Sequence, residues 1–164
     1  MIYLLDANVF MAASRLHYGL DFCPAFWGWL IENNKKDRVF SIERIAVEVQ
    51  AGDDALAEWA SGRGPEFFLK PDTALQSTLG TLAQWATSQQ YEPAAISTFF
   101  QVADYYLVAH ALAHNYVVVT HEVPANSVKR IKIPNACMGV GVRHMSPFEM
   151  LRREKARFIL GRQR

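Results

Sequence analysis

The chain opens with an apolar run, residues 2–6, that ends in an acid, Asp6. The run does not alternate between polar and apolar residues, which is typical of a central strand of a parallel sheet, buried on both faces. A second run of this kind covers residues 116–120 and is followed closely by Glu122. We therefore predict two short buried strands, each leading to an acid at its carboxyl end.

Segments with helical spacing separate these runs from further strand candidates. Helices are predicted over residues 8–17, 24–33, 42–50, 55–60 and 93–114, from Asp72 to about residue 90, and from Ser146 onward. Further strands are predicted over residues 38–40, 67–69 and 141–145. Residues 124–140 contain two prolines and two asparagines and are predicted to form a long loop.

Helix caps and the order of elements complete the predicted architecture. Ser41 and Asp72 are suited to cap the helices that follow them, and residues 146–149 form a capping box with Pro at the first helical position. Short strands alternating with helices imply right-handed crossovers. The predicted fold is α/β, with three layers (α/β/α) and a short central parallel sheet. We expect residues 1–164 to form one domain, with a basic C-terminal helix and tail from about residue 146.

Composition is that of an ordinary globular protein, with 51% hydrophobic and 20% charged residues. No apolar run approaches the roughly 18 residues that a membrane-spanning helix needs, and the first residues lack the basic region of a signal peptide. Cys23 and Cys137 are too few for a disulfide scaffold, so we predict a cytoplasmic protein with no membrane partner. The absence of a Gly-rich phosphate loop disfavours P-loop and dinucleotide-binding proteins.

Charge is distributed unevenly along the sequence. From Lys129 to the end there are ten Lys and Arg against two acids, whereas the first 128 residues hold seven basic and fourteen acidic residues. A basic tail after an acidic body is suited to contact phosphates while the acids hold a metal. The same pattern is equally typical of a solvated helix face and a charged terminus. Lys129, Arg130 and Lys132 are the candidate substrate-binding residues.

Four acids are placed where they could gather. In open α/β sheets ligands bind beyond the carboxyl ends of the strands, which Asp6 and Glu122 reach if their strands are neighbours. Asp104 lies near the start of an apolar-rich stretch of helix. Glu48 interrupts another apolar stretch and is predicted to face inward, with Glu43 as its rival and an exposed side chain as the alternative. Converging carboxylates repel each other unless a divalent cation lies among them, and oxygen ligands suit Mg²⁺ or Mn²⁺. Asp6, Glu48, Asp104 and Glu122 are therefore the candidate catalytic and metal-binding residues.

Other polar residues have two readings each. Asn8 is suited to hold a carboxylate or ligand by hydrogen bonds, or to cap a helix. Thr120 is suited to bond a metal-associated water or a phosphate, or to serve structure alone. His110 and His114 have a spacing compatible with zinc but lack the accompanying ligands, so an exposed pair facing solvent is predicted. His121 is predicted to be a loop residue rather than a general base.

Together, these segments resemble the PIN-domain ribonucleases, the family that contains the VapC-type toxins. Residues 4–8, Leu-Leu-Asp-Ala-Asn, look like the opening strand and first acid of that family, and Glu48 matches the second acid. Residues 103–111 resemble the helix of the third acid, and residues 118–122 resemble the strand that leads to the fourth. Many members have Asp where this chain has Glu122. This difference leaves the number of metal ions open. The long loop predicted at 124–140 and the sequence of residues 146–151 further suggest a PIN-like branch distinct from a typical VapC.

The resemblance implies metal-dependent hydrolysis of RNA phosphodiester bonds. Asp6, Glu48, Asp104 and Glu122 would bind Mg²⁺ or Mn²⁺, and Lys and Arg between residues 129 and 157 would hold the RNA backbone without reading its sequence. The implied partners are the RNA substrate, a small antitoxin protein and a second copy of the chain.

Three alternatives remain open at this point. A PIN-like domain without activity would serve as an interaction module, and a nuclease of related fold would cut DNA. A phosphotransfer enzyme or receiver domain could be built around Asp6, although haloacid-dehalogenase phosphatases have a second Asp where this chain has Asn8.

Overall fold

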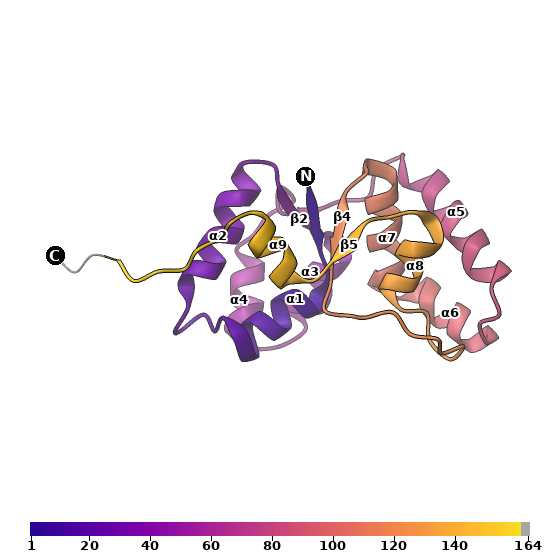
Figure 1. Cartoon of the computed structure of the whole chain (residues 1–164), viewed down its shortest axis with the longest axis horizontal. Helices are drawn as coiled ribbons and strands as arrows, with labels where there is room; N and C mark the ends of the chain where they lie inside the picture. The colour runs from indigo at the N-terminus through magenta and orange to yellow at the C-terminus, as the bar shows by residue number, and fades with distance from the viewer. Residues whose placement is uncertain (162–164) are drawn as a thin grey trace.

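A parallel sheet forms the centre of the computed structural model, which describes residues 1–161 (Figure 1). Its strands lie in the order β3-β2-β1-β4-β5. Tyr3 and Leu5 of β1 pair in register with Val117 and Val119 of β4. The strands are β1 (Tyr3–Leu5), β2 (Val39–Ile42), β3 (Phe68–Leu69), β4 (Val117–Val119) and β5 (His144–Met145). The two apolar runs of the sequence are therefore neighbouring strands at the middle of the sheet.

Helices cover both faces of this sheet. In Figure 1, α1, α2, α4 and α9 lie on one side and α5 to α8 on the other, which confirms the predicted three-layer α/β fold. The helices are α1 (Ala7–Ala12), continued by a π-helical turn, η1 (Ala13–His17), then α2 (Pro24–Lys35), α3 (Glu43–Gln50), α4 (Ala55–Ser61), α5 (Leu75–Ser88), α6 (Pro93–Gln101), α7 (Ala103–His114), α8 (Ile133–Val140) and α9 (Pro147–Arg153).

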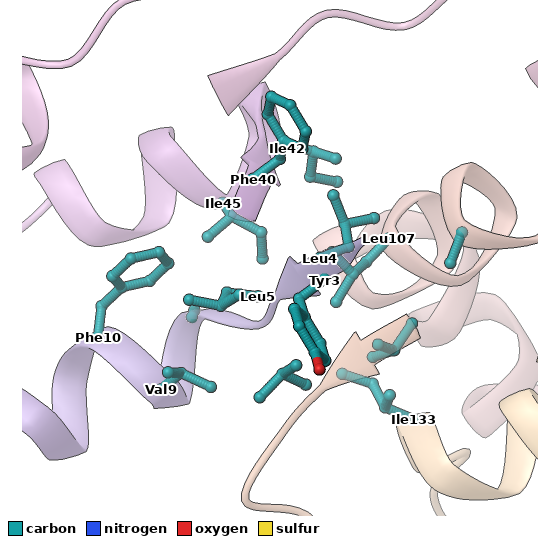
Figure 2. Packing of buried hydrophobic residues seen from close by; sticks show 14 of the residues in the cluster. Tyr3, Leu4, Leu5, Val9, Phe10, Phe40, Ile42, Ile45, Leu107 and Ile133 are labelled. Atoms are coloured by element: carbon teal, nitrogen blue, oxygen red, sulfur yellow. The ribbon is translucent and has the colours of Figure 1, made fainter. Parts of the chain in front are cut away.

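The core is built around β1, in which all three residues are buried. Phe10 and Ile45 pack near Leu5 from one layer, and Leu107 and Ile133 approach from the other (Figure 2). Burying such side chains stabilises a fold by roughly 1.5–3 kcal/mol each relative to leaving them in water. The absence of alternation in residues 2–6 thus reflects burial on both faces of the sheet.

Two predicted helix boundaries are wrong. Ser41 does not cap a helix but lies in β2, where its hydroxyl donates to the carbonyl of Leu5 over 2.6 Å. The predicted helix 93–114 is two helices, because Val102 adopts an extended conformation (φ −105°, ψ 162°) between α6 and α7. No Pro or Gly marks this break in the sequence, so tertiary packing has overridden local preference. Its consequence is that Asp104 lies in the first turn of α7.

The predicted loop 124–140 contains helix α8. Pro134 is compatible with a helix because it lies in the first turn, where its missing N–H is not needed. Gly141 ends the helix in the left-handed conformation (φ 77°). A Cβ at Gly139 would collide with the Trp85 ring, so glycine allows α8 to approach α5 closely.

The remaining predicted caps have different outcomes. Asp72 bonds the backbone N–H of Ala74, but α5 begins only at Leu75. Ser146 caps α9 as predicted, by accepting from the backbone N–H of Glu149. Beyond α9 the chain passes α2 (Figure 1), where the ring of Phe158 packs against the rings of Tyr18 and Phe26. Arg162 and Arg164 of the predicted basic tail lie outside the described residues.

We expect Ser41→Ala to lower the free energy of unfolding by about 1–2 kcal/mol, because it removes a buried hydroxyl and leaves the Leu5 carbonyl without that donor. Urea unfolding followed by circular dichroism measures this loss as a lower midpoint at unchanged slope. The exposed Ser77, on α5, gives the matched Ser77→Ala control, expected within about 0.5 kcal/mol of wild type. Equal midpoints for the two variants would contradict this role of Ser41.

Candidate functional site

Asp6 lies where β1 ends and α1 begins, at the carboxyl edge of the sheet. Its side chain is buried, with 5% of the residue exposed. One carboxylate oxygen accepts from the backbone N–H of Ala7 over 2.7 Å, and the other accepts from the Thr120 hydroxyl over 2.9 Å. Asp6 therefore caps α1 and is held at the same time by the end of β4.

Thr120 is the centre of a small hydrogen-bond network. Its oxygen accepts from the Asn8 side-chain amide over 3.2 Å and from the backbone N–H of Glu122 over 3.1 Å. The Asn8 carbonyl oxygen in turn accepts from the backbone N–H of His121. Thr120 thus bonds the Asp6 carboxylate, and Asn8 bonds both Thr120 and His121. Both residues position the loop after β4 against Asp6.

Asp6 and Asp104 are acids whose pKa values are raised by burial and by neighbouring carboxylates. Burial raises the pKa of Asp6 from 3.8 to about 8, with further contributions from Asp104 and Glu122. Burial also raises the pKa of Asp104 to about 6, assisted by Glu122 and Glu48, whereas Arg130 acts in the opposite direction. Such effects of one carboxylate on the pKa of another require short separations, since charges are screened over longer distances. The structure therefore brings the four predicted acids into one neighbourhood.

The prediction that Glu48 faces inward is wrong: it is exposed on α3, where Ile45 and Val49 are the buried residues. It faces a cavity rather than the core, and partial burial raises its pKa. Glu43 lines the same cavity. Only Glu48 of the two contributes to the raised pKa of Asp104, which favours Glu48 over its rival.

Glu122 is held on both sides. One oxygen accepts from the Arg130 guanidinium over 2.8 Å, and the other accepts from the backbone N–H of Ile133, at the start of α8, over 3.0 Å. The Glu122 side chain is only 11% exposed, whereas that of Arg130 is 64% exposed. Arg130, predicted to hold substrate, is therefore also the counter-ion of the fourth acid.

Two of the four candidate acids line a cavity of about 980 Å³. Its wall includes three acids, Glu43, Glu48 and Asp104, and three basic residues, Arg44, Lys129 and Arg130. Of the basic residues between 129 and 157, only Lys129 and Arg130 line it, and Lys132, half-buried, does not. The cavity thus combines carboxylates with cations, as a site for a metal-assisted reaction on a phosphate requires.

Arg44 is a cavity residue that the sequence analysis did not single out. Its guanidinium lies 3.6 Å from the centre of the Tyr106 ring, a cation–π contact that fixes its position. A signal was available in the sequence, because Arg44 lies only two residues after the end of β2 and so falls at the carboxyl edge of the sheet.

The donor set fits a hydrated divalent cation. Within residues 1–161, no three His, Cys, Asp or Glu side chains are arranged so that together they could hold a metal ion directly. Mg²⁺ usually keeps several waters and contacts only one or two carboxylates. Asp6 and Asp104, whose raised pKa values show how costly their charges are, are the two carboxylates that a cation would most relieve.

The histidine predictions are partly wrong. His110 does not face solvent: it is buried with 3% exposed, and burial lowers its pKa to about 4. His114 binds Asp72, with 2.7 Å between Nε2 and Oδ2. His121 lies beside the rings of His17 and Phe148, and burial lowers its pKa. A neutral, buried His110 is suited to packing rather than to the solvent-facing role predicted.

Among the described residues, none of the helices is both long enough and apolar enough to cross a bilayer.

The fold is shared with proteins of distant sequence. It is similar to VapBC2 from Rickettsia felis bound to a DNA fragment from their promoter, with TM-score 0.54, 16% identity, and 89% of this chain and 98% of that chain covered. It is also similar to FitAcB from Neisseria gonorrhoeae, with TM-score 0.54, 17% identity, and coverage of 90% and 99%. FitAB bound to the IR36 DNA fragment gives the same score at 16% identity, with 90% and 96% covered. The predicted PIN-like fold is thereby confirmed.

At the level of sequence, no curated protein matches the chain. One family does match, and it covers residues 3–158, nearly the whole described chain. The chain therefore belongs to the family described as a domain of unknown function, DUF4411.

Proposed function

We propose that this protein is an Mg²⁺- or Mn²⁺-dependent endoribonuclease and the toxin of a toxin–antitoxin pair. The observation that carries the proposal is that Glu48 and Asp104 line one cavity, and that the pKa of Asp104 is raised by Glu122 and Glu48 while that of the buried Asp6 is raised by Asp104 and Glu122. Without a bound cation, buried acids that repel each other lower the stability of the folded chain. A divalent cation bound among the acids would offset this repulsion.

The chain's own residues divide the work. Asp6 and Asp104 are proposed to contact the cation, and Glu48 and Glu122 to hold its waters. A bound divalent cation supplies an activated water at neutral pH and offsets the charge of the phosphate. Thr120 keeps the Asp6 carboxylate in one orientation through its 2.9 Å hydrogen bond, and Asn8 keeps Thr120 in place.

The substrate is proposed to be RNA held by its backbone. Lys129, Arg130 and Arg44 place positive charge on the wall of the cavity next to Glu48 and Asp104. Contacts between such side chains and phosphates position a strand without reading its sequence. Lys132, outside the cavity wall, is proposed to act at longer range.

The biological partners are inferred from the shared fold. VapBC2 and FitAB have this fold, and on this basis we propose that this chain acts in the cytoplasm with a small antitoxin and as a homodimer. A small gene beside this one, whose product binds the chain and stops RNA cleavage, would support the toxin assignment. A chain that retains its metal but cuts only DNA would identify the DNA-directed alternative.

We expect Asp104→Asn to abolish Mn²⁺-dependent RNA cleavage while the far-ultraviolet circular dichroism spectrum stays unchanged. The substitution removes a carboxylate but keeps its size, and it relieves repulsion with Glu122 and Glu48. Cleavage of a labelled RNA is compared in Mn²⁺ and in EDTA. The exposed Asp53→Asn is the matched control and should cut like wild type. If Asp104→Asn cuts as fast as wild type, the assignment is wrong; if wild type cuts equally in EDTA, the metal is not required.

We expect Mn²⁺ to raise the melting temperature more at about pH 8 than at about pH 5.5. The raised pKa values of Asp6 (about 8) and Asp104 (about 6) contribute stability that is present below pH 3.8 and lost as the pH rises through these values. The metal binds the ionised carboxylates, so it restores more stability where the metal-free chain has lost more. Calorimetric melting with Mn²⁺ and with EDTA at both pH values measures this. An equal shift at both, or a shift that survives Asp104→Asn, would count against these ligands.

We expect Lys129→Gln to weaken RNA binding and to reduce the slope of log K against log salt by about 0.7, the value for one contact with a single strand. Binding is measured in the Asp104→Asn background, so that the RNA stays intact. Lys36→Gln is the control, because Lys36 precedes β2 and lies at the opposite, amino edge of the sheet. The same loss for both variants would mean that Lys129 acts through net charge alone.

A further inference from the structure

Glu122 is the one acid of the group, among the described residues, that has a basic side chain of its own. Its Oε1 lies 2.8 Å from Nη2 of Arg130, and its Oε2 accepts from the backbone N–H of Ile133. The carboxylate is 11% exposed, so water contributes little to its solvation. The negative charge of Glu122 is therefore offset by the chain itself.

Asp6 and Asp104 are treated differently. The donors to the Asp6 carboxylate are uncharged, an N–H from Ala7 and the hydroxyl of Thr120. Within residues 1–161, the ion pairs to acids involve Glu32, Glu154, Asp72 and Glu122, and none involves Asp6 or Asp104. The chain thus places its positive charge at the Glu122 end of the acid group and leaves the Asp6 end without one.

We propose that the guanidinium of Arg130 takes the place of a second metal ion, so that the site binds one divalent cation per chain, at Asp6 and Asp104. This inference rests on the proposed metal-dependent function. A second divalent ion near Glu122 would have to displace a cation already 2.8 Å from the carboxylate. Arg130 is thus a positioning residue for Glu122 and a limit on the number of ions.

Arginine suits this role for chemical reasons. Its guanidinium stays charged at all relevant pH values and has five N–H donors in a planar fork, only one of which is used on Glu122. With 64% of the side chain exposed and Arg130 on the wall of the cavity, the remaining donors are accessible to a phosphate. The same residue that closes the second metal position can therefore contact the substrate.

The experiment counts Mn²⁺ ions bound per chain, by titration calorimetry without RNA, for wild type and Arg130→Gln. Wild type is expected to bind one ion and Arg130→Gln two, since Glu122 then lacks its counter-ion. Arg130→Lys keeps the charge and should still bind one. The double variant Arg130→Gln/Glu122→Gln should return to one, because the second ion needs the Glu122 carboxylate. Arg143→Gln, an exposed arginine before β5 at the opposite edge, is the matched control.

The outcomes separate this inference from the proposed function. Two ions on wild type, one ion on Arg130→Gln, or two on the double variant each overturn the role of Arg130 while metal dependence stands. No ion on wild type overturns both. Circular dichroism and melting of each variant verify that it is folded, which the exposure of Arg130 leads us to expect. Arg130→Lys changes the side chain but keeps its positive charge, so comparing it with Arg130→Gln separates the loss of charge from the change of residue.

Discussion

The site depends on the parallel pairing of β1 with β4. Tyr3 to Leu5 lie in register with Val117 to Val119, so Asp6 and the segment from Thr120 to Glu122 leave the sheet at the same edge. These two segments are separated by more than a hundred residues in sequence. Both strands are buried on both faces, and burial of a strand fixes its register strongly. The packing of the apolar core thereby brings together acids whose negative charges repel each other.

Bringing acids together costs free energy because their charges repel each other, and different groups offset the charge of each acid. Asp6 has two uncharged donors, Glu122 has a guanidinium and a backbone N–H, and Asp104 lies in the first turn of α7, where the helix dipole favours a negative charge. Glu48 remains exposed to the cavity. The raised pKa values of Asp6 and Asp104 mark the part of this cost that the metal-free chain leaves uncompensated.

The predictability of these features follows from how local their causes are. Unbroken apolar runs predicted β1 and β4, and the capping box predicted the start of α9, because those signals lie within a few residues. The break at Val102 and the burial of His110 depend on packing between layers and left no local mark. Helix α8 was missed because Pro134 resembles a loop signal unless its place in the first turn is known. The contact between Glu122 and Arg130 joins residues of an irregular segment, in which no periodicity indicates proximity.

Thr120 gives the site a constraint of a different kind. A hydroxyl can donate one hydrogen bond, and Thr120 donates its own to the Asp6 carboxylate. The Thr120 oxygen also accepts from the side-chain amide of Asn8 and from the backbone N–H of Glu122. If the Thr120 hydroxyl donated to a ligand instead, the buried Asp6 carboxylate would lose one of its hydrogen bonds. In this arrangement Thr120 therefore has no hydrogen-bond donor left for a ligand. Serine could reproduce these hydrogen bonds, whereas valine, which has the same shape as threonine, could not. The position therefore requires a hydroxyl group rather than a side chain of a given volume.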